Sequence, residues 1–174
     1  FPQSQQGEFC RVVPGEASLQ PMIQRIQSIY LLAACILCVA TMSTGIAHFH
    51  TLQGEPVADM YNLWFTMADG QHDLRPWSLF VLLLIVSTLS FLDILLFRRR
   101  ALQMRVASFC MILLVGWYVV YGFFVWEAVE SFHADFRPTV AAALPFAALV
   151  AQWLAFRGIL HDERLVRSSY DRLR

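Results

Sequence analysis

Four long apolar runs constrain this chain more than any other feature of its sequence. They cover residues 29–49, 77–97, 106–126 and 139–156, and Asp93 carries the only formal charge inside them. A helix crosses the roughly 30 Å of a membrane's hydrocarbon core with about 20 apolar residues. Backbone groups cannot bond to water at that depth, so each run is expected to be a helix rather than a strand. The sequence therefore predicts an all-α, integral membrane four-helix bundle.

Composition supports this prediction. Hydrophobic residues make up 57% of the chain and charged residues 15%, whereas soluble domains contain about 45–50% and about 25%. A chain of 174 residues has too little interior to bury this excess, so the lipid bilayer is the expected partner of the apolar surface. The net charge of zero argues against binding to nucleic acid, which requires a surplus of cations.

The first apolar run has three interpretations. It is a permanent membrane helix, a lipoprotein anchor processed at the LAAC of residues 32–35, or a cleaved signal peptide. Signal peptides have apolar regions of about 7–15 residues, followed by a small-residue cleavage site. This run is longer, and more apolar residues follow Cys35 directly. The permanent helix is therefore the favoured interpretation.

The arginine distribution predicts the orientation of the bundle. Basic residues gather on the cytoplasmic side of membrane helices. With Met22 inside, ten of the thirteen basic residues lie on the inner side, while Arg75 and Arg137 lie on the outer side. Both termini are therefore expected to be cytoplasmic, in the inner membrane of a bacterial cell.

The segments outside the apolar runs complete the expected organisation. Residues 1–21 are expected to be a flexible leader outside the fold, with Met22 as the natural start of a transmembrane domain that covers 22–174. Residues 157–174 are expected to continue the fourth helix as a cytoplasmic tail. In the first outer loop, a short interfacial helix is predicted from apolar residues at helical spacing: Val57, Met60, Tyr61, Trp64 and Phe65.

Two polar side chains within the apolar runs are candidate functional groups. Asp93 is expected to pair with Arg105 near the inner interface, although a proton or substrate role and a solvated position stay open. Gln152 is expected to form a hydrogen bond across the bundle, in a helix bent by Pro145. Small residues at every fourth position of that helix predict close helix contacts, and with them a homo-oligomer: Ala143, Ala147, Ala151 and Ala155.

Metal, cofactor and catalytic sites are not expected. His48 and His50 point about 200° apart on a helix, and neither forms a metal-binding pattern with His72 or His133. The CILC of residues 35–38 lies in the middle of a membrane run, where a redox-active thiolate would be disfavoured, so these cysteines are expected to be packing residues.

Three stretches resemble a known family. They are MIQRIQSIYLLAA at 22–34, RRRALQMRV at 98–106 and RGILHDERLVRSSYDRLR at 157–174. They resemble domain of unknown function 4293, a family of small four-helix membrane proteins of bacteroidete bacteria that has no established activity. The resemblance implies that the recognisable residues gather at the cytoplasmic end: Gln24, Arg25, Gln27, Gln103, Arg105, Asp162, Glu163, Arg167, Asp171 and Arg172.

Two functions follow as hypotheses. The first is a structural or interaction module, not an enzyme, that docks a protein partner on an Arg-rich cytoplasmic face. The residues expected on this face are Arg25, Arg98, Arg99, Arg100, Arg105, Asp162, Glu163, Arg167, Asp171 and Arg172. The alternative is a small transporter or membrane enzyme acting on a lipid or quinone-type ligand, with Asp93 and Gln152 in its cavity.

Overall fold

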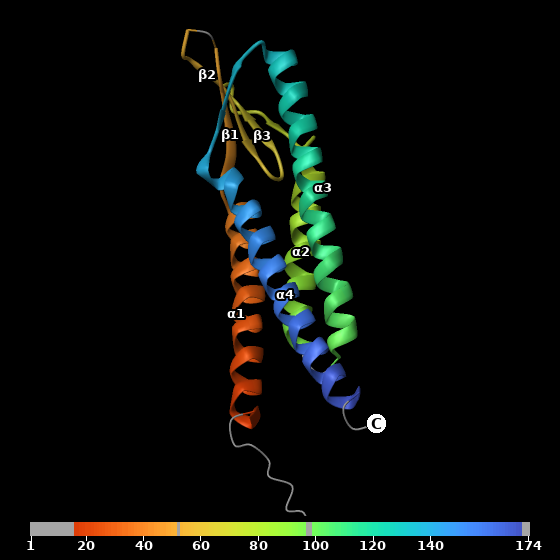
Figure 1. Ribbon diagram of the computed structural model, residues 1–174. Helices are drawn as coiled ribbons and strands as arrows, with labels where there is room; N and C mark the ends of the chain where they lie inside the picture. The colour runs from red at the N-terminus through yellow and green to blue at the C-terminus, as the bar shows by residue number, and fades with distance from the viewer. Residues whose placement is uncertain (1–15, 52, 97–98, 172–174) are drawn as a thin grey trace, which may run out of the picture.

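Four helices form the body of the molecule, and a small antiparallel sheet covers one end of it (Figure 1). The computed structural model describes residues 16–51, 53–96 and 99–171, with side chains described for 27–51, 53–96, 99 and 101–161. The helices are α1 (Glu16–Ser43), α2 (Trp77–Leu95), α3 (Arg100–Phe132) and α4 (Leu144–Asp171). Each packs on two neighbours in the cyclic order α1, α2, α3, α4.

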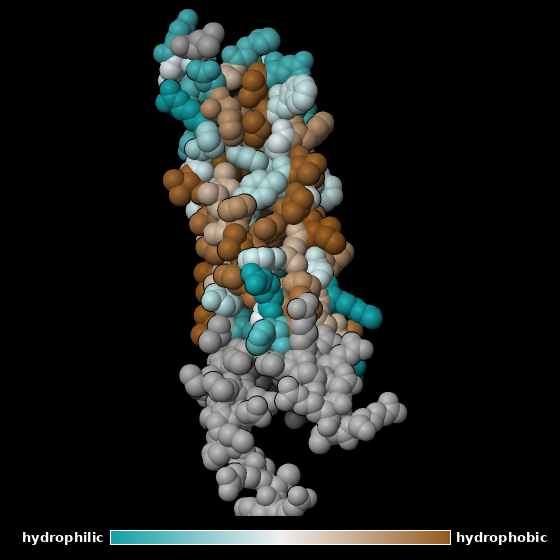
Figure 2. Space-filling view, in the orientation of Figure 1, coloured by the Kyte–Doolittle hydropathy of each residue, from teal (hydrophilic) through white to brown (hydrophobic). Residues whose placement is uncertain are grey.

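Three of the helices are long and apolar enough to span a membrane. The segments are Trp77–Leu95, Ala101–Phe132 and Val140–His161, and the apolar part of α1, Gln27–Ser43, is shorter. Figure 2 shows hydrophobic side chains over the middle of the bundle and hydrophilic ones over the sheet. This distribution is consistent with a membrane protein.

The sheet is the main departure from the predicted all-α fold. It consists of β1 (Gly45–His50), β2 (Pro56–Tyr61), β3 (Phe65–Met67), β4 (His72–Asp73) and β5 (Asp135–Pro138) in the antiparallel order β4-β3-β2-β1-β5. Its inner face packs on the outer part of α3, where Phe49 of β1 contacts Phe132. At 33 residues, α3 is about 50 Å long, which exceeds the hydrocarbon thickness of about 30 Å.

The predicted interfacial helix of the first outer loop is wrong. Strands β2 and β3 occupy that part of the chain, and along β2 the buried residues Ala58 and Met60 alternate with half-buried Val57, Asp59 and Tyr61. Apolar residues at helical spacing suggested a helix. The strand's period of two was overlooked because one of its buried residues, Ala58, is small.

The first helix also ends earlier than predicted, because residues 45–49 belong to β1. The hydroxyl groups of Thr41, Ser43 and Thr44 donate hydrogen bonds to the carbonyl oxygens of Leu37, Val39 and Ala40, in the last turns of α1. Such bonds give hydrogen-bond donors to carbonyl groups near the end of the helix. Gly45, at the start of β1, follows directly. A count of apolar residues does not detect this end of the helix, because β1 is also apolar.

The remaining helices differ less from expectation. Helix α3 begins before and ends after the predicted 106–126, and α4 continues into the predicted cytoplasmic tail. A short 3-10 helix, η1 (Val140–Ala143), precedes α4. Pro145 is the second residue of α4 and therefore does not bend the helix from within, because the first turn has no backbone partner for the missing N–H. Helix α1 begins at Glu16 and includes the last residues of the predicted leader.

One buried side chain, Asn62 in the β2–β3 turn, joins the sheet to the bundle. Its amide donates to the carbonyl oxygen of Thr41 at 2.6 Å and accepts from the Trp117 indole N–H at 3.2 Å. Its backbone carbonyl accepts the N–H of Phe80, in the first turn of α2, at 3.2 Å. Both helix termini expose backbone groups without intrahelical partners. Asn62 thus satisfies the end of α1 and the start of α2 at once.

The Asn62→Ala variant is expected to lose about 2–4 kcal/mol of stability, because it leaves the Trp117 N–H buried without its partner and removes the 2.6 Å hydrogen bond to the Thr41 carbonyl, which keeps only the 3.4 Å bonds from Thr44. Thermal unfolding of the purified protein in a mild detergent measures the loss. Gln71→Ala, at an exposed position in the β3–β4 turn, is the control. Equal midpoints for the two variants would contradict this role of Asn62.

Candidate functional site

Buried polar side chains occur on all four helices of the bundle. Among the residues whose side chains are described, they are Gln27 and Thr41 on α1, Ser87, Ser90 and Asp93 on α2, Gln103 on α3, and Gln152 on α4. On α2 the residues that face the bundle change along the helix, from Leu79 and Leu83 near its start to Ser90 and Asp93 near its end. The face of α2 that is turned toward the bundle therefore changes from apolar to polar along the helix.

Asp93 is the most unusual member of this set. Its side chain is fully buried, and neither carboxylate oxygen has a hydrogen-bond partner in the described part of the chain. Its backbone carbonyl accepts a 3.4 Å hydrogen bond from the Gln103 side chain. The predicted ion pair with Arg105 is wrong, because the Arg105 side chain is exposed whereas Asp93 is buried. The alternative of a solvated Asp93 is wrong for the same reason. A charge held this way costs several kcal/mol unless a proton or another ligand neutralises it.

Gln152 is also fully buried, and neither atom of its amide has a partner among the described residues. The predicted hydrogen bond across the bundle is therefore not formed with any side chain that the structure describes. Near Asp93, the hydroxyl oxygen of Ser90 is likewise buried, and no nitrogen or oxygen atom of the described residues bonds to it. Ser87, Ser90 and Asp93 follow one another at intervals of three residues on one face of α2. This spacing was the sequence signal for a polar stripe, of which only Asp93 was predicted to be a candidate functional group.

The cysteines of the bundle are packing residues, as predicted. Cys38 and Cys110 are fully buried in the hydrophobic core, and Cys35 contacts the backbone carbonyl and the hydroxyl group of Ser87 at 3.6 and 3.5 Å. No disulfide involves these three cysteines. In the described residues, no three His, Cys, Asp or Glu side chains come together as metal ligands. His48 instead bonds to Asp59 on the neighbouring strand.

The predicted Ala stripe is divided between two elements, because Ala143 ends η1 and the other three alanines lie on α4. Ala151 and Ala155 are buried, whereas Ala143 and Ala147 are exposed. Small residues do permit a close approach within the bundle: a Cβ added to Gly158 would lie 3.1 Å from the Gln27 Cγ atom. Homo-oligomer contact therefore stays a prediction for the exposed pair, because the buried pair already packs on other helices.

The predicted cytoplasmic face is described only in part. Arg99 and Arg105 are exposed. Gln27 and Gln103 are buried, so they do not belong to an exposed docking surface. Arg98 and Arg172 lie outside the described residues. Other members lie outside the residues whose side chains are described: Gln24, Arg25, Arg100, Asp162, Glu163, Arg167 and Asp171.

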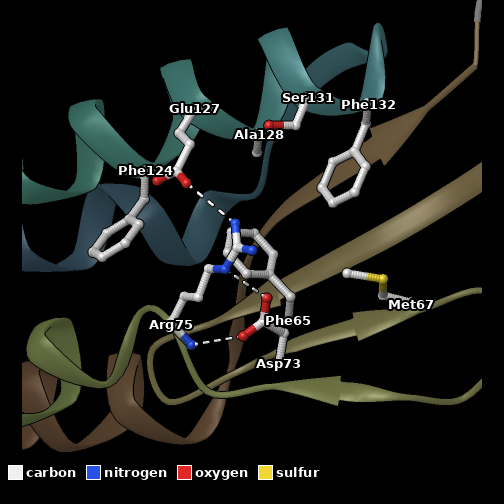
Figure 3. A pocket seen from close by; sticks show the side chains of 9 residues that line it. All are labelled: Phe65, Met67, Asp73, Arg75, Phe124, Glu127, Ala128, Ser131 and Phe132. Atoms are coloured by element: carbon white, nitrogen blue, oxygen red, sulfur yellow. Dashed lines mark hydrogen bonds and ion pairs between the residues drawn. The ribbon is translucent and has the colours of Figure 1, made fainter.

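A pocket of about 200 Å³ lies between the sheet and the outer part of α3 (Figure 3). Phe65 and Met67 of β3 and Phe124 and Phe132 of α3 line it. Arg75 spans the rim in two ion pairs: its Nε atom lies 3.0 Å from the Asp73 carboxylate, and its Nη1 atom lies 3.2 Å from the Glu127 carboxylate. Sequence reasoning missed this pocket because its residues come from three segments that are brought together only by the sheet.

A wider apolar groove of about 580 Å³ lies where η1 meets α3 and α4. Val140 and Phe146 are among its residues and are largely exposed. The Tyr118 hydroxyl donates to the Ala142 carbonyl at 2.8 Å and holds η1 against α3. The groove opens on the apolar flank of the bundle, where lipid chains are the expected neighbours.

The structure is a bundle of four helices, three of them long and apolar enough to span a membrane, with an antiparallel sheet at one end and buried Ser90 and Asp93 toward the other. The model of the family described as domain of unknown function (DUF4293) matches residues 23–173. The chain belongs to this family, as its three characteristic stretches predicted. No curated protein matches the chain in sequence.

Replacing Asp93 with Asn is expected to increase the free energy of unfolding by about 1–2 kcal/mol, because the amide carries no charge to be buried. The midpoint of thermal unfolding is expected to rise accordingly. Asp135→Asn changes the net charge equally at an exposed position of β5 and is expected to leave the midpoint unchanged. A lower midpoint for Asp93→Asn alone would contradict the absence of a stabilising partner for the carboxylate.

Proposed function

We propose that this protein is a small integral inner-membrane module that binds a protein partner at its cytoplasmic end and is not an enzyme. The observation that carries the proposal is the exposure of Arg99 and Arg105 at the end of the bundle opposite the sheet. No ion pair involves either side chain among the described residues. Exposed guanidinium groups at one end of a bundle suit an acidic partner, because they form paired hydrogen bonds with carboxylates.

The topology that this proposal needs has both termini in the cytoplasm. Two observations support it. The start of α1 and the end of α4 lie at the same end of the bundle, and the sheet lies at the other (Figure 1). The arginines are concentrated at the end that holds the helix termini, as basic residues are on the cytoplasmic side of membranes.

Cysteine labelling in intact cells is expected to place the two ends on opposite sides of the membrane. Gln53→Cys lies at an exposed position of the β1–β2 loop, and His161→Cys lies at an exposed position of α4. A membrane-impermeant maleimide is expected to label Gln53→Cys before lysis and His161→Cys only after lysis. The unsubstituted chain gives the background from its own cysteines. The reverse pattern would contradict the proposed orientation.

Copurification tests the docking face. The full chain is extracted from its native membrane in a mild detergent, and retained proteins and lipids are identified by mass spectrometry. The Arg99→Gln, Arg105→Gln double variant is expected to retain about tenfold less of a stoichiometric acidic partner. Raised salt is expected to release the same partner from the unsubstituted chain.

Arg137→Gln is the matched control, since it removes an exposed arginine from β5 at the opposite end. It is expected to retain the partner. Equal loss from both variants, or full retention by the double variant, would contradict docking at the cytoplasmic end.

The second candidate function is a small transporter or membrane enzyme that acts on a lipid or quinone-type ligand. Asp93 and Gln152 favour it, because both are fully buried with unpartnered polar atoms, and ionisable groups inside membranes mark ion and substrate paths. The copurification separates the candidates. If the interaction function holds, the Asp93→Asn, Gln152→Ala variant retains the partner. If the second function holds, a defined lipid or quinone copurifies with the unsubstituted chain and is lost from this variant.

A further inference from the structure

The pocket between the sheet and α3 has the dimensions of a site for a small group. Its volume is about 200 Å³, whereas pockets for drug-sized ligands measure roughly 300–1,000 Å³. Its walls belong to a packed aromatic cluster, in which the Phe49 ring lies 6.2 Å from Phe65 and 6.4 Å from Phe132. These contacts hold the walls in place, so the pocket is a preformed cavity.

The rim of the pocket has a net negative charge. Arg75 is shared between Asp73 and Glu127, so one of the two carboxylate charges is left over (Figure 3). The backbone N–H of Arg75 also donates to the Asp73 Oδ1 atom at 3.1 Å, which fixes that carboxylate at the rim. An anion that approached Arg75 would meet both carboxylates, whereas a cation gains from the excess charge.

We propose that this pocket binds an organic ammonium ion with a short apolar body. Aromatic faces attract quaternary and alkylated ammonium groups, and the excess carboxylate charge adds to this attraction. Phe65, Phe124 and Phe132 receive the alkyl groups, and Glu127 faces the positive charge from the more exposed side of the rim. The apolar body replaces water in the pocket and adds affinity through burial.

This site is independent of the docking face, because it lies at the opposite end of the bundle. The ammonium group belongs either to a free metabolite-sized ion or to a lipid headgroup. The chemistry at the pocket is the same for both sources.

Calorimetric titration of the purified full chain in a maltoside detergent tests the proposal with choline as the probe. Choline is expected to bind at one site with a Kd no weaker than about 1 mM. The uncharged isostere 3,3-dimethylbutan-1-ol is expected to bind at least about fivefold more weakly, because it lacks the charge that the rings and carboxylates attract. Acetate, as the anionic probe, is expected not to bind.

Two rim variants give effects of opposite sign. Glu127→Gln is expected to weaken choline binding by about three- to tenfold, and Arg75→Gln is expected to strengthen it by a similar factor, since the resident cation is gone. Glu130→Gln is the matched control on the same helix, where Glu130 is exposed and accepts a hydrogen bond from the Trp126 indole. It is expected to leave choline binding unchanged.

Nanodiscs identify the source of the ammonium group. If choline competes with bound lipid headgroups, its apparent affinity is lower in phosphatidylcholine discs than in phosphatidylglycerol discs. If the natural ligand is a free ion, the two affinities are equal. Three results would overturn the proposal: no saturable choline binding, equal affinity for the uncharged isostere, or weaker choline binding by Arg75→Gln.

Discussion

The arrangement of the whole molecule depends on the buried amide of Asn62. Its side chain and backbone bond to the end of α1, to the indole of Trp117 on α3 and to the first turn of α2. Trp117 in turn stacks on Tyr121, whose hydroxyl bonds to the Ile46 carbonyl at the start of β1. In a buried setting each of these bonds replaces one that water would otherwise make, so losing one partner strands another. The sheet is therefore held at a fixed angle on the bundle, and the pocket beside α3 keeps its shape.

The polar groups deeper in the bundle differ from Asn62 in their hydrogen bonding. Asn62 is fully engaged, but Asp93, Ser90 and Gln152 have buried polar atoms without hydrogen bonds among the described residues. Native proteins satisfy nearly all such groups, and exceptions coincide with strain or function. The unpartnered polar groups on α2 and α4 therefore lower the stability of the bundle, because leucine or alanine could fill the same positions without burying a polar atom.

How much was predictable varies with the range of the interactions involved. The positions of the helices were predictable because the length of an apolar run reports directly on burial in lipid. The family was predictable from three local stretches, and residues 23–173 match its model. The sheet was not, since apolar residues at helical spacing obscured the period of two in β2, and β1 pairs with a strand from a distant part of the chain, as His48 does with Arg137. The polar stripe of Ser87, Ser90 and Asp93 could have been predicted from its spacing. The lack of a hydrogen-bond partner for Asp93 could not, because it depends on which side chains of α3 and α4 lie beside it.

The sequence by itself determined that this chain is mostly helical, with helices long and apolar enough for a membrane, and that its arginines gather at one end. Hydropathy is a sum over neighbouring residues, so local composition carries that information. Only the tertiary structure decided that β1 pairs with residues 135–138 and so joins them to the strands of residues 45–73 in one sheet, and that Arg75 closes a pocket against Glu127. Hydrogen-bond pairing and charge pairing depend on distances in space, and residues 52 positions apart in the chain become neighbours only when the bundle has folded.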